Sequence, residues 1–322
     1  MLSSMKTCQF SPMDVSQPLL LPHSCRQYDR ERYACNLHAP HAARAGLFAL
    51  HAFNLETIKI GGAMSDAAAG TMRFAWWRET VGKCLAGRPP EHPVAEALAH
   101  VHAATGLTPR YLTQLLDARE ADFHLQQPRD LGELSTYAER TSGALLLLGL
   151  EVSGDAGCDS AERAASHAGT ALGLLAVLRG TAAHAAQRCC YLPAEVTARH
   201  GVDLARALQG QPSFELSAAV AEVAGAATAH LLAARAMQPG LGTAARTVLL
   251  PATVADLIGQ TLHAHACALA CLPQASQCFP RVLLSTHGTF HGRYSPFEPG
   301  VREPLGAKLQ LALLWRRLSS TY

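Results

Sequence analysis

The sequence predicts an all-α protein from its composition, from the spacing of its apolar residues and from the lack of strand-like segments. Of the 322 residues, 49% are apolar and only 6% are aromatic. Alanine, which has the highest helix propensity, is abundant throughout. From residue 40 onward apolar side chains recur at helical spacing, and no segment of strand length alternates between apolar and polar residues.

The helices are predicted from their start and stop signals. Pro40 suits the first turn of a helix, and Gly61-Gly62 is expected to end that helix. Thr108 followed by Pro109 is a typical N-cap and first helical position. The predicted helices cover residues 40–60, 65–86, 93–104, 109–124, 130–152, 159–180, 202–208, 213–236, 246–272 and 304–318.

Two segments fall outside this helical pattern. Residues 1–25 contain three prolines and few charges, so we predict a flexible N-terminal segment and at most a weak targeting sequence. Residues 273–304 contain five prolines and are expected to form an irregular stretch. The remainder, residues 26–322, is predicted to form one helical domain.

Charge, apolar runs and cysteine content give no support for nucleic-acid binding, a membrane span or a disulfide framework. A formal net charge of +2, without long basic runs, gives no support for nucleic-acid binding. No apolar run reaches the length of a membrane span, and the nearest approach, at residues 143–150, is far too short. The ten cysteines contain no C-x-x-C pair, which favours free thiols in a reducing compartment.

Several segments, in order along the chain, resemble the squalene/phytoene synthase family. They are residues 47–54 (Leu-Phe-Ala-Leu-His-Ala-Phe-Asn), 74–78 (Phe-Ala-Trp-Trp-Arg), 137–143 (Tyr-Ala-Glu-Arg-Thr-Ser-Gly), 173–179 (Gly-Leu-Leu-Ala-Val-Leu-Arg) and 191–193 (Tyr-Leu-Pro). The resemblance implies a single-domain helical bundle of the isoprenoid-synthase type around a central cavity. In active members of this family, two aspartate-rich helix motifs hold Mg²⁺ ions that bind the diphosphate of a prenyl substrate.

This chain departs from the family pattern at the metal-binding positions. The two aspartate pairs of the family correspond to Ile58 and Gly62 in the first motif and to Gly180 and His184 in the second. None of the four is acidic, and no acidic residue occurs from residue 179 to 193. We therefore expect no metal ion, no cofactor and no catalytic residues, and so no enzyme activity.

Within the family, the chain resembles the mitochondrial complex I assembly factor 6 group, which keeps the scaffold but lacks the aspartates. The resemblance is carried by residues 28–35, 52–56, 178–184 and 315–322. It implies a non-catalytic assembly factor on the matrix side of the mitochondrial inner membrane. Its partners would be complex I subunits or assembly intermediates, with peripheral membrane contact.

Two other functions stay open from the sequence. The chain could bind a lipid or isoprenoid in the old cavity, unless close packing of its alanine-rich helices has closed that cavity, or it could retain prenyl-diphosphate transferase activity. Trp76 and Trp77 differ by about 100° around a helix, so one should be in the core and the other partly exposed. Candidate cavity or partner contacts are Phe53, Trp76, Trp77, Arg78, Tyr137, Arg179 and Tyr191.

Two of the candidate residues have competing interpretations. Arg179 is expected to form a structural ion pair, with anion binding as the alternative. His184 could be a general base, but it is more simply read as a residue that lines the cavity, since no nucleophile or acidic partner is near it in sequence.

Overall fold

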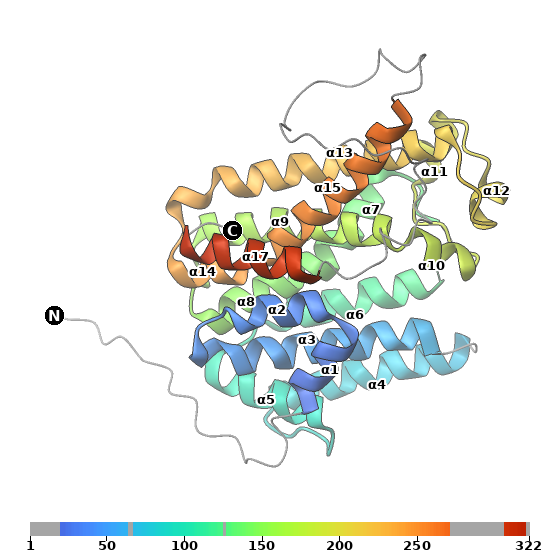
Figure 1. The fold of residues 1–322 in the computed structure, drawn as a ribbon. Coiled ribbons are helices and arrows are strands. Elements are labelled where there is room, and N and C mark those ends of the chain that lie inside the picture. The colour runs from blue at the N-terminus through green and yellow to red at the C-terminus, as the bar shows by residue number, and fades with distance from the viewer. Residues whose placement is uncertain (1–19, 64–66, 125–126, 271–305, 320–322) are drawn as a thin grey trace.

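The computed structural model describes residues 20–63, 67–124, 127–270 and 306–319, and every regular element in these ranges is a helix (Figure 1). The predicted all-α class is confirmed. The α-helices are α1 (Leu20–Tyr28), α2 (Arg30–Leu37), α3 (His41–Ala63), α4 (Ala67–Leu85), α5 (Pro93–Thr105), α6 (Pro109–His124), α7 (Leu131–Ala138), α8 (Ala144–Ser153), α9 (Asp159–Arg179), α10 (Thr181–Ala186), α11 (Ala194–Arg199), α12 (Leu204–Leu208), α13 (Phe214–Ala236), α14 (Thr243–Val248), α15 (Pro251–Ala270) and α17 (Gly306–Leu318). A π-helical turn, η1 (Glu139–Gly143), joins α7 to α8, and a short 3₁₀ turn, η2 (Gln238–Gly240), follows α13.

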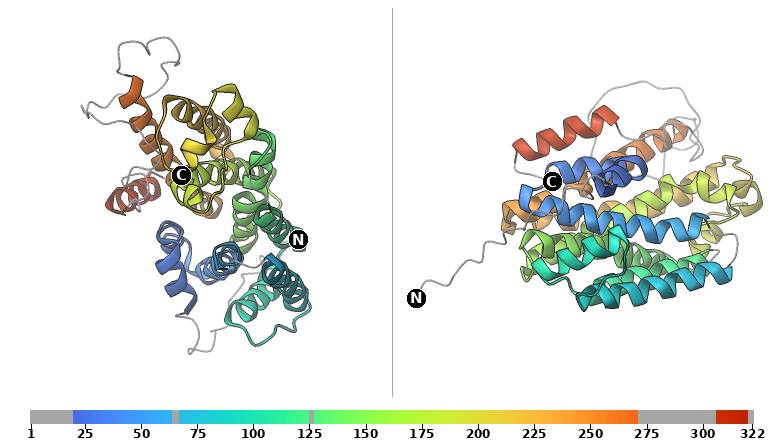
Figure 2. Two further views of the ribbon diagram at one scale, coloured as in Figure 1. Left: turned by 90° about the vertical axis from the view of Figure 1, so that its right-hand side faces the viewer. Right: turned by 90° about the horizontal axis from the view of Figure 1, so that it is seen from below.

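The bundle has two apolar cores that share helix α8. One core lies among α3, α4, α5 and α6, and the other among α9, α13 and α15 (Figures 1 and 2). On α8, Leu145 and Leu148 face the first core, whereas Leu146 and Leu150 face the second. Because side chains three or four residues apart share one face of a helix, α8 presents an apolar stripe to each side.

The start signals in the sequence place several helices correctly. Helix α5 begins with Pro93 at its first position, and Gly106 ends it with φ 71, a left-handed conformation that favours glycine. Helix α6 begins at Pro109, as Thr108 and Pro109 predict.

Several boundaries differ from the prediction: α10 and α11 lie where no helix was predicted, and the predicted helix over residues 130–152 consists of α7, η1 and α8. Helix α3 continues through Gly61 and Gly62 to Ala63, so the glycine pair does not end it where expected. The helix predicted over residues 246–272 is two helices, α14 and α15, because Pro251 lacks the N–H that a continuous helix would need there. Helices α1 and α2 lie before the first predicted helix.

The N-terminal boundary predicted at residue 25 lies inside α1. The described chain begins with α1 at Leu20, and Cys25 of this helix is fully buried, with its thiol donating to the backbone oxygen of Phe48 at 3.8 Å. Residues 1–19 and the predicted irregular stretch at 273–304 lie outside the described residues.

Helix α13 is long and apolar enough to cross a membrane by length and composition. Its window has a mean hydropathy of 1.4, and 39% of that window is buried in the protein. It packs against α9 and α15, with Val220 and Val223 in the second core. Core helices of globular domains meet the same criterion, so this property alone does not indicate a membrane span.

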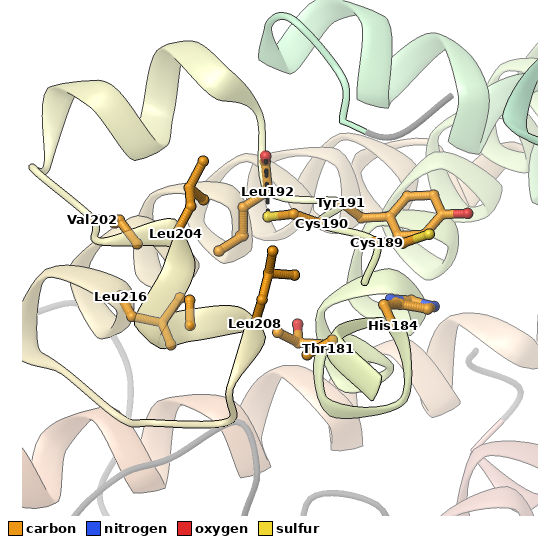
Figure 3. Close-up of a pocket in the computed structure, with 12 residues that line it drawn as sticks. Thr181, His184, Cys189, Cys190, Tyr191, Leu192, Val202, Leu204, Leu208 and Leu216 are labelled. Atoms are coloured by element: carbon orange, nitrogen blue, oxygen red, sulfur yellow. Dashed lines mark hydrogen bonds between the residues drawn. The ribbon is translucent and has the colours of Figure 1, made fainter. Parts of the chain in front are cut away.

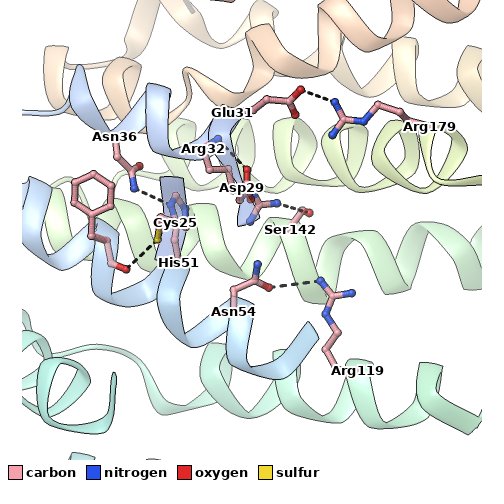
Figure 4. A network of polar contacts seen from close by, with 11 residues as sticks. Cys25, Asp29, Glu31, Arg32, Asn36, His51, Asn54, Arg119, Ser142 and Arg179 are labelled. Carbon is pink, nitrogen blue, oxygen red and sulfur yellow. Dashed lines mark hydrogen bonds and ion pairs between the residues drawn. The ribbon is translucent and has the colours of Figure 1, made fainter. Parts of the chain in front are cut away.

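Helices α1, α2 and α3 are joined by buried polar contacts (Figure 4). Arg32 pairs with Asp29 and donates to the hydroxyl of Ser142 at 3.2 Å, which ties α2 to η1. Asn36 and His51, both buried, share a hydrogen bond of 2.7 Å between α2 and α3. These pairs satisfy polar groups that would otherwise be buried at a cost in free energy.

The burial of His51 predicts a loss of stability in acid. Burial, assisted by the nearby Arg32 cation, lowers the pKa of His51 from 6.5 to about 3. Below pH 6.5 the unfolded chain therefore binds a proton that the folded chain does not, so stability is complete above this pH and falls as the pH drops toward 3. Between pH 7 and pH 5 we expect His51 to lower the free energy of unfolding by about 2 kcal/mol.

Urea unfolding of His51→Gln at the two pH values tests this expectation. The variant should lose about 2 kcal/mol less than the unmodified protein over this range, whereas the exposed-residue control His41→Gln should not differ from it. An unchanged pH dependence in His51→Gln would contradict the assignment.

Candidate functional site

The two degenerate motifs occupy helix α3 and the junction of α9 with α10. In the first motif, Ile58 is 42% exposed near the end of α3, and Gly62 follows one turn later. In the second motif, Gly180 links α9 to α10, and His184 lies within α10. Lys59, next to Ile58, is paired with Glu56 at 2.8 Å, so this acid is already bound to a cation.

Gly180 and His184 fit each other closely. A Cβ atom at position 180 would lie 2.6 Å from Cε1 of the His184 ring, a distance that real side chains do not adopt. The imidazole therefore covers the backbone where the family pattern has an aspartate. An aspartate at position 180 is incompatible with His184 in this conformation.

Burial and ring packing define the environment of His184 in the described part of the chain. Burial lowers its pKa to about 4, so the ring is neutral at physiological pH. Its Nδ1 atom is buried without a hydrogen-bond partner in the described part of the chain, and its ring lies 4.4 Å from that of Tyr191. A general base needs a substrate proton within reach and is usually oriented by a second group, so this arrangement favours the cavity-lining interpretation.

A half-buried polar network, which we call the Asp122 network, connects α3 to the second motif. It consists of Asn54, Arg119, Asp122, Tyr137 and Tyr191. Tyr137 donates to Asp122 at 3.0 Å, and Tyr191 hydrogen-bonds the same carboxylate. Arg119 donates to the Tyr137 hydroxyl and, at 3.5 Å, to the side-chain oxygen of Asn54. The network thus places fixed side chains between the two motifs.

Charge within this network is balanced internally. Burial raises the pKa of Asp122, and hydrogen bonds from Tyr191 and Tyr137 and the Arg119 cation oppose that rise. Burial also raises the pKa values of Tyr137 and Tyr191, which keeps both hydroxyls protonated as donors. By distance, Tyr137 occupies Oδ2 of this carboxylate, whereas Oδ1 is buried without a hydrogen-bond partner among the described residues.

The predicted ion pair of Arg179 is present. Its guanidinium donates to the carboxylate of Glu31 at 2.6 Å, and Glu31 is only 8% exposed (Figure 4). This pair joins α9 to α2, far apart in the sequence. An anion-binding role for Arg179 would compete with Glu31 for the same cation.

The aromatic candidates lie mainly in the first core. Phe53 and Trp77 are fully buried, with ring centroids 5.3 Å apart, and Trp76 is partly exposed, as the helical spacing predicted. Arg78 forms ion pairs with Asp117 and Glu120 of α6. The structure therefore brings Tyr137, Tyr191 and His184 together, while Phe53, Trp76, Trp77 and Arg78 lie elsewhere.

A recess lies beside the second motif, between α10, α12 and α13 (Figure 3). The space in it that a water-sized group can occupy is only about 10 Å³, so its own side chains nearly fill it. His184 and Tyr191 line one side, and Val202, Leu204 and Leu216 line the other. Its walls are mainly apolar, which suits a small apolar group better than a diphosphate.

The residues present do not fit the Mg²⁺ ions of the family pattern. Hard divalent cations need several oxygen ligands, but the four motif positions supply an isoleucine, two glycines and a histidine. Within the described ranges, no three His, Cys, Asp or Glu side chains come together in a group able to hold a metal ion. No step of metal-assisted chemistry can be derived from this arrangement.

Glu31, Asp122, Arg119 and Asn54 lie in segments that carry the family resemblance, but the sequence did not single them out as candidate contacts. Two carboxylates do approach the second motif in space, from α2 and α6, although no acid is near it in sequence. The spacing of Arg119 and Asp122, three apart on one face of α6, was the available signal. The partner of each acid depends on the tertiary fold.

Several proteins from animals are similar in sequence to this chain. Complex I assembly factor 6 of NADH dehydrogenase (ubiquinone) from Bos taurus is 36% identical over 210 residues, and the Homo sapiens protein is 35% identical. Each match covers 65% of this chain and 63% of the relative, so the chain spans 63% of the length of these mammalian proteins. The Drosophila melanogaster homolog is 32% identical over 71% of this chain and 70% of its own length.

Solved structures share the fold at low sequence identity. A dehydrosqualene synthase matches with a TM-score of 0.73 and 18% identity, over 93% of this chain and 94% of that one. Squalene synthase HpnC from Alicyclobacillus acidocaldarius matches with a TM-score of 0.68 and 17% identity, over 76% and 94%. These matches confirm the predicted isoprenoid-synthase fold.

The family model of squalene/phytoene synthases matches residues 25–285 of the chain. With its fold and its sequence in agreement, this chain belongs to the squalene/phytoene synthase family.

Proposed function

We propose that this protein is a non-catalytic assembly factor for respiratory complex I, which binds a partner subunit at the mitochondrial inner membrane. The observation that carries the non-catalytic part is the replacement of all four motif carboxylates, with His184 packed over Gly180. The assembly part is supported by similarity to relatives named assembly factor 6. The matrix side of the membrane is the proposed location.

The internal pairing of polar residues supports this proposal. Asp122 is bound by Tyr137 and Tyr191, and Arg179 by Glu31. A synthase needs such groups free to bind metal and diphosphate, because the leaving pyrophosphate must be stabilised as charge develops. Here they stabilise the scaffold.

Complementation tests the assembly role. The chain, with a mitochondrial targeting sequence, would be expressed in cells that lack their own assembly factor 6, and assembled complex I would be measured on native gels. We expect recovery of the complex, and equal recovery with His184→Ala, since the motif position has no catalytic task. No recovery, together with no complex I subunit in a pull-down, would refute the assembly role.

A separate assay tests for residual prenyl-diphosphate transferase activity. The purified protein would be incubated with farnesyl diphosphate and Mg²⁺, and pyrophosphate release measured. We expect no release above the background without protein, because the Mg²⁺ ligands are missing. Mg²⁺-dependent release would overturn the non-catalytic part of the proposal, whatever the outcome of complementation.

A binding protein for a lipid or isoprenoid tail is the second candidate, and it requires the apolar recess to widen, because the lining side chains now nearly fill it. Leu204, Leu208 and Leu216 give it apolar walls next to the old second motif. Native mass spectrometry of the protein purified from cells tests this candidate. A retained apolar ligand that is lost in Leu208→Gln would support it, and a ligand-free mass would count against it.

A further inference from the structure

Helix α17 exposes a large apolar face to solvent. Leu309 and Leu313 are buried against the rest of the protein, whereas Leu311, Leu314 and Trp315 are 69%, 49% and 70% exposed. At about 100° per residue, the exposed residues centre on the side of the helix opposite Leu309 and Leu313. Helix α17 is therefore apolar on two faces, and the rest of the protein covers only one of them.

The charge of α17 is entirely basic. Its sequence contains Lys308, Arg316 and Arg317 and no acidic residue. Lys308 is exposed one turn before Leu311, on the same outer side of the helix. Arg316 turns inward and pairs with Asp256 of α15 at 3.2 Å, which fixes the orientation of α17 on the bundle.

The neighbouring helix α2 extends this surface. Helices α2 and α17 are in contact and lie side by side on one side of the molecule (Figures 1 and 2). Helix α2 adds the exposed Arg30 and the 41% exposed Leu37. Its one acidic residue, Glu31, is buried and bound to Arg179. We define the α17 face as Lys308, Leu311, Leu314 and Trp315 of α17 together with Arg30 and Leu37 of the neighbouring α2. Among the described residues of these two helices it combines apolar and cationic side chains and includes no exposed acid.

We infer that the α17 face binds the surface of a membrane that contains acidic phospholipids. Leucine and tryptophan side chains would enter the boundary between headgroups and acyl chains, where the amphipathic indole ring is favoured. Arg30 and Lys308 would contact the lipid phosphates, since basic side chains near an anionic leaflet each contribute to binding. The chain binds the membrane from one side, and no span is required.

Charge complementarity favours a lipid surface over the other possible occupants. A second copy of this chain would add the same cations to the interface, and its α2 and α17 offer no exposed acid to pair with them. An apolar protein helix would satisfy the leucines but leave both cations without a counter-charge. An anionic lipid surface satisfies both sets of side chains together.

Flotation with lipid vesicles tests the inference on the full chain. We expect the protein to float with phosphatidylcholine vesicles that contain phosphatidylserine, and to bind pure phosphatidylcholine vesicles much more weakly. The double variant Leu311→Gln/Trp315→Gln should bind the acidic vesicles at least about tenfold more weakly, because two apolar side chains no longer leave water. Lys308→Glu should weaken binding at least about fivefold to acidic vesicles alone.

Matched controls separate this effect from misfolding. Met72 of α4 is 73% exposed, so Met72→Gln removes an apolar side chain of equal exposure away from the α17 face and should bind as the unmodified protein does. Arg88→Glu is the control for charge reversal at an exposed position. Substitutions at such exposed sites change stability little, and equal thermal midpoints would verify folding.

Intrinsic fluorescence gives a second readout. The chain has three tryptophans, of which Trp77 is buried, Trp76 is partly buried and Trp315 is 70% exposed. A blue shift on addition of acidic vesicles should therefore come from Trp315 and be absent in Trp315→Phe.

Each outcome decides the inference. It would be overturned if acidic vesicles did not bind the unmodified protein, or if the double variant bound them equally well. It would also be overturned if light scattering showed that the unmodified protein is a dimer and the double variant a monomer, since a second copy would then cover this face. The assay contains only protein and lipid, so its failure leaves the complex I complementation result unaffected, and failed complementation leaves vesicle binding intact.

Discussion

Replacement of Gly169 by alanine should lower the free energy of unfolding by about 3 kcal/mol, the upper end of the usual overpacking cost. A Cβ atom at position 169 would lie 2.4 Å from Cα and 2.6 Å from the backbone nitrogen of Gly143. Both atoms belong to the backbone, so no side-chain rotation can relieve the contact. Helix α9 would have to move away from the π-helical turn η1, and buried packing between them would be lost.

Gly82→Ala is the matched control for this prediction. Gly82 also lies inside a helix, α4, and nothing lies within 4 Å of a Cβ atom built there. Because alanine has the higher helix propensity, Gly82→Ala should raise the free energy of unfolding by about 0.5–1 kcal/mol. Urea denaturation of both variants gives the comparison. A stable Gly169→Ala protein would show that α9 and η1 are less closely packed than described.

Replacement of Arg179 by leucine should lower the free energy of unfolding by about 2–3 kcal/mol. Glu31, at 8% exposure, would lose the guanidinium that now lies 2.6 Å from its carboxylate. Breaking a buried ion pair from one side costs several kcal/mol because a charge is left without its counter-charge. The partial exposure of Arg179 reduces that cost here.

A double-mutant cycle isolates the interaction energy between Arg179 and Glu31 from their other contacts. Arg179→Leu/Glu31→Leu should recover most of the loss, since no unmatched charge remains. Arg199→Leu removes an arginine that is also ion-paired, to Glu195 and Glu222, but half exposed, and should cost less than about 1 kcal/mol. Equal costs in Arg179→Leu and Arg199→Leu would contradict the role given to burial. Stabilisation of the unmodified protein by added pyrophosphate would instead favour the anion-binding alternative.

The fold could be predicted from the sequence because its signals are local. Alanine content, helical spacing and proline or glycine signals act within a few residues, so α5 and α6 start where Pro93 and Pro109 predict. Gly61 and Gly62 show the limit of such signals, since α3 runs through both. Glycine weakens a helix by about 1 kcal/mol, a cost that tertiary packing readily offsets.

The candidate site could be predicted only in part. The loss of acids at Ile58, Gly62, Gly180 and His184 follows from aligning motifs along the chain, and the partner of Arg179 was expected to be an acid. That this acid is Glu31, 148 residues away, depends on how α2 packs against α9. The same holds for Asp122, whose two phenol donors come from residues 137 and 191.

The contact between Gly180 and His184 couples the two positions of the second motif. A side chain at position 180 would require the imidazole of His184 to move, because a Cβ atom there would lie 2.6 Å from its Cε1 atom. The ring is the far end of a flexible side chain and can rotate away. An engineered carboxylate pair in the second motif would therefore be built by substituting Gly180 and His184 together, so that neither side chain has to make room for the other.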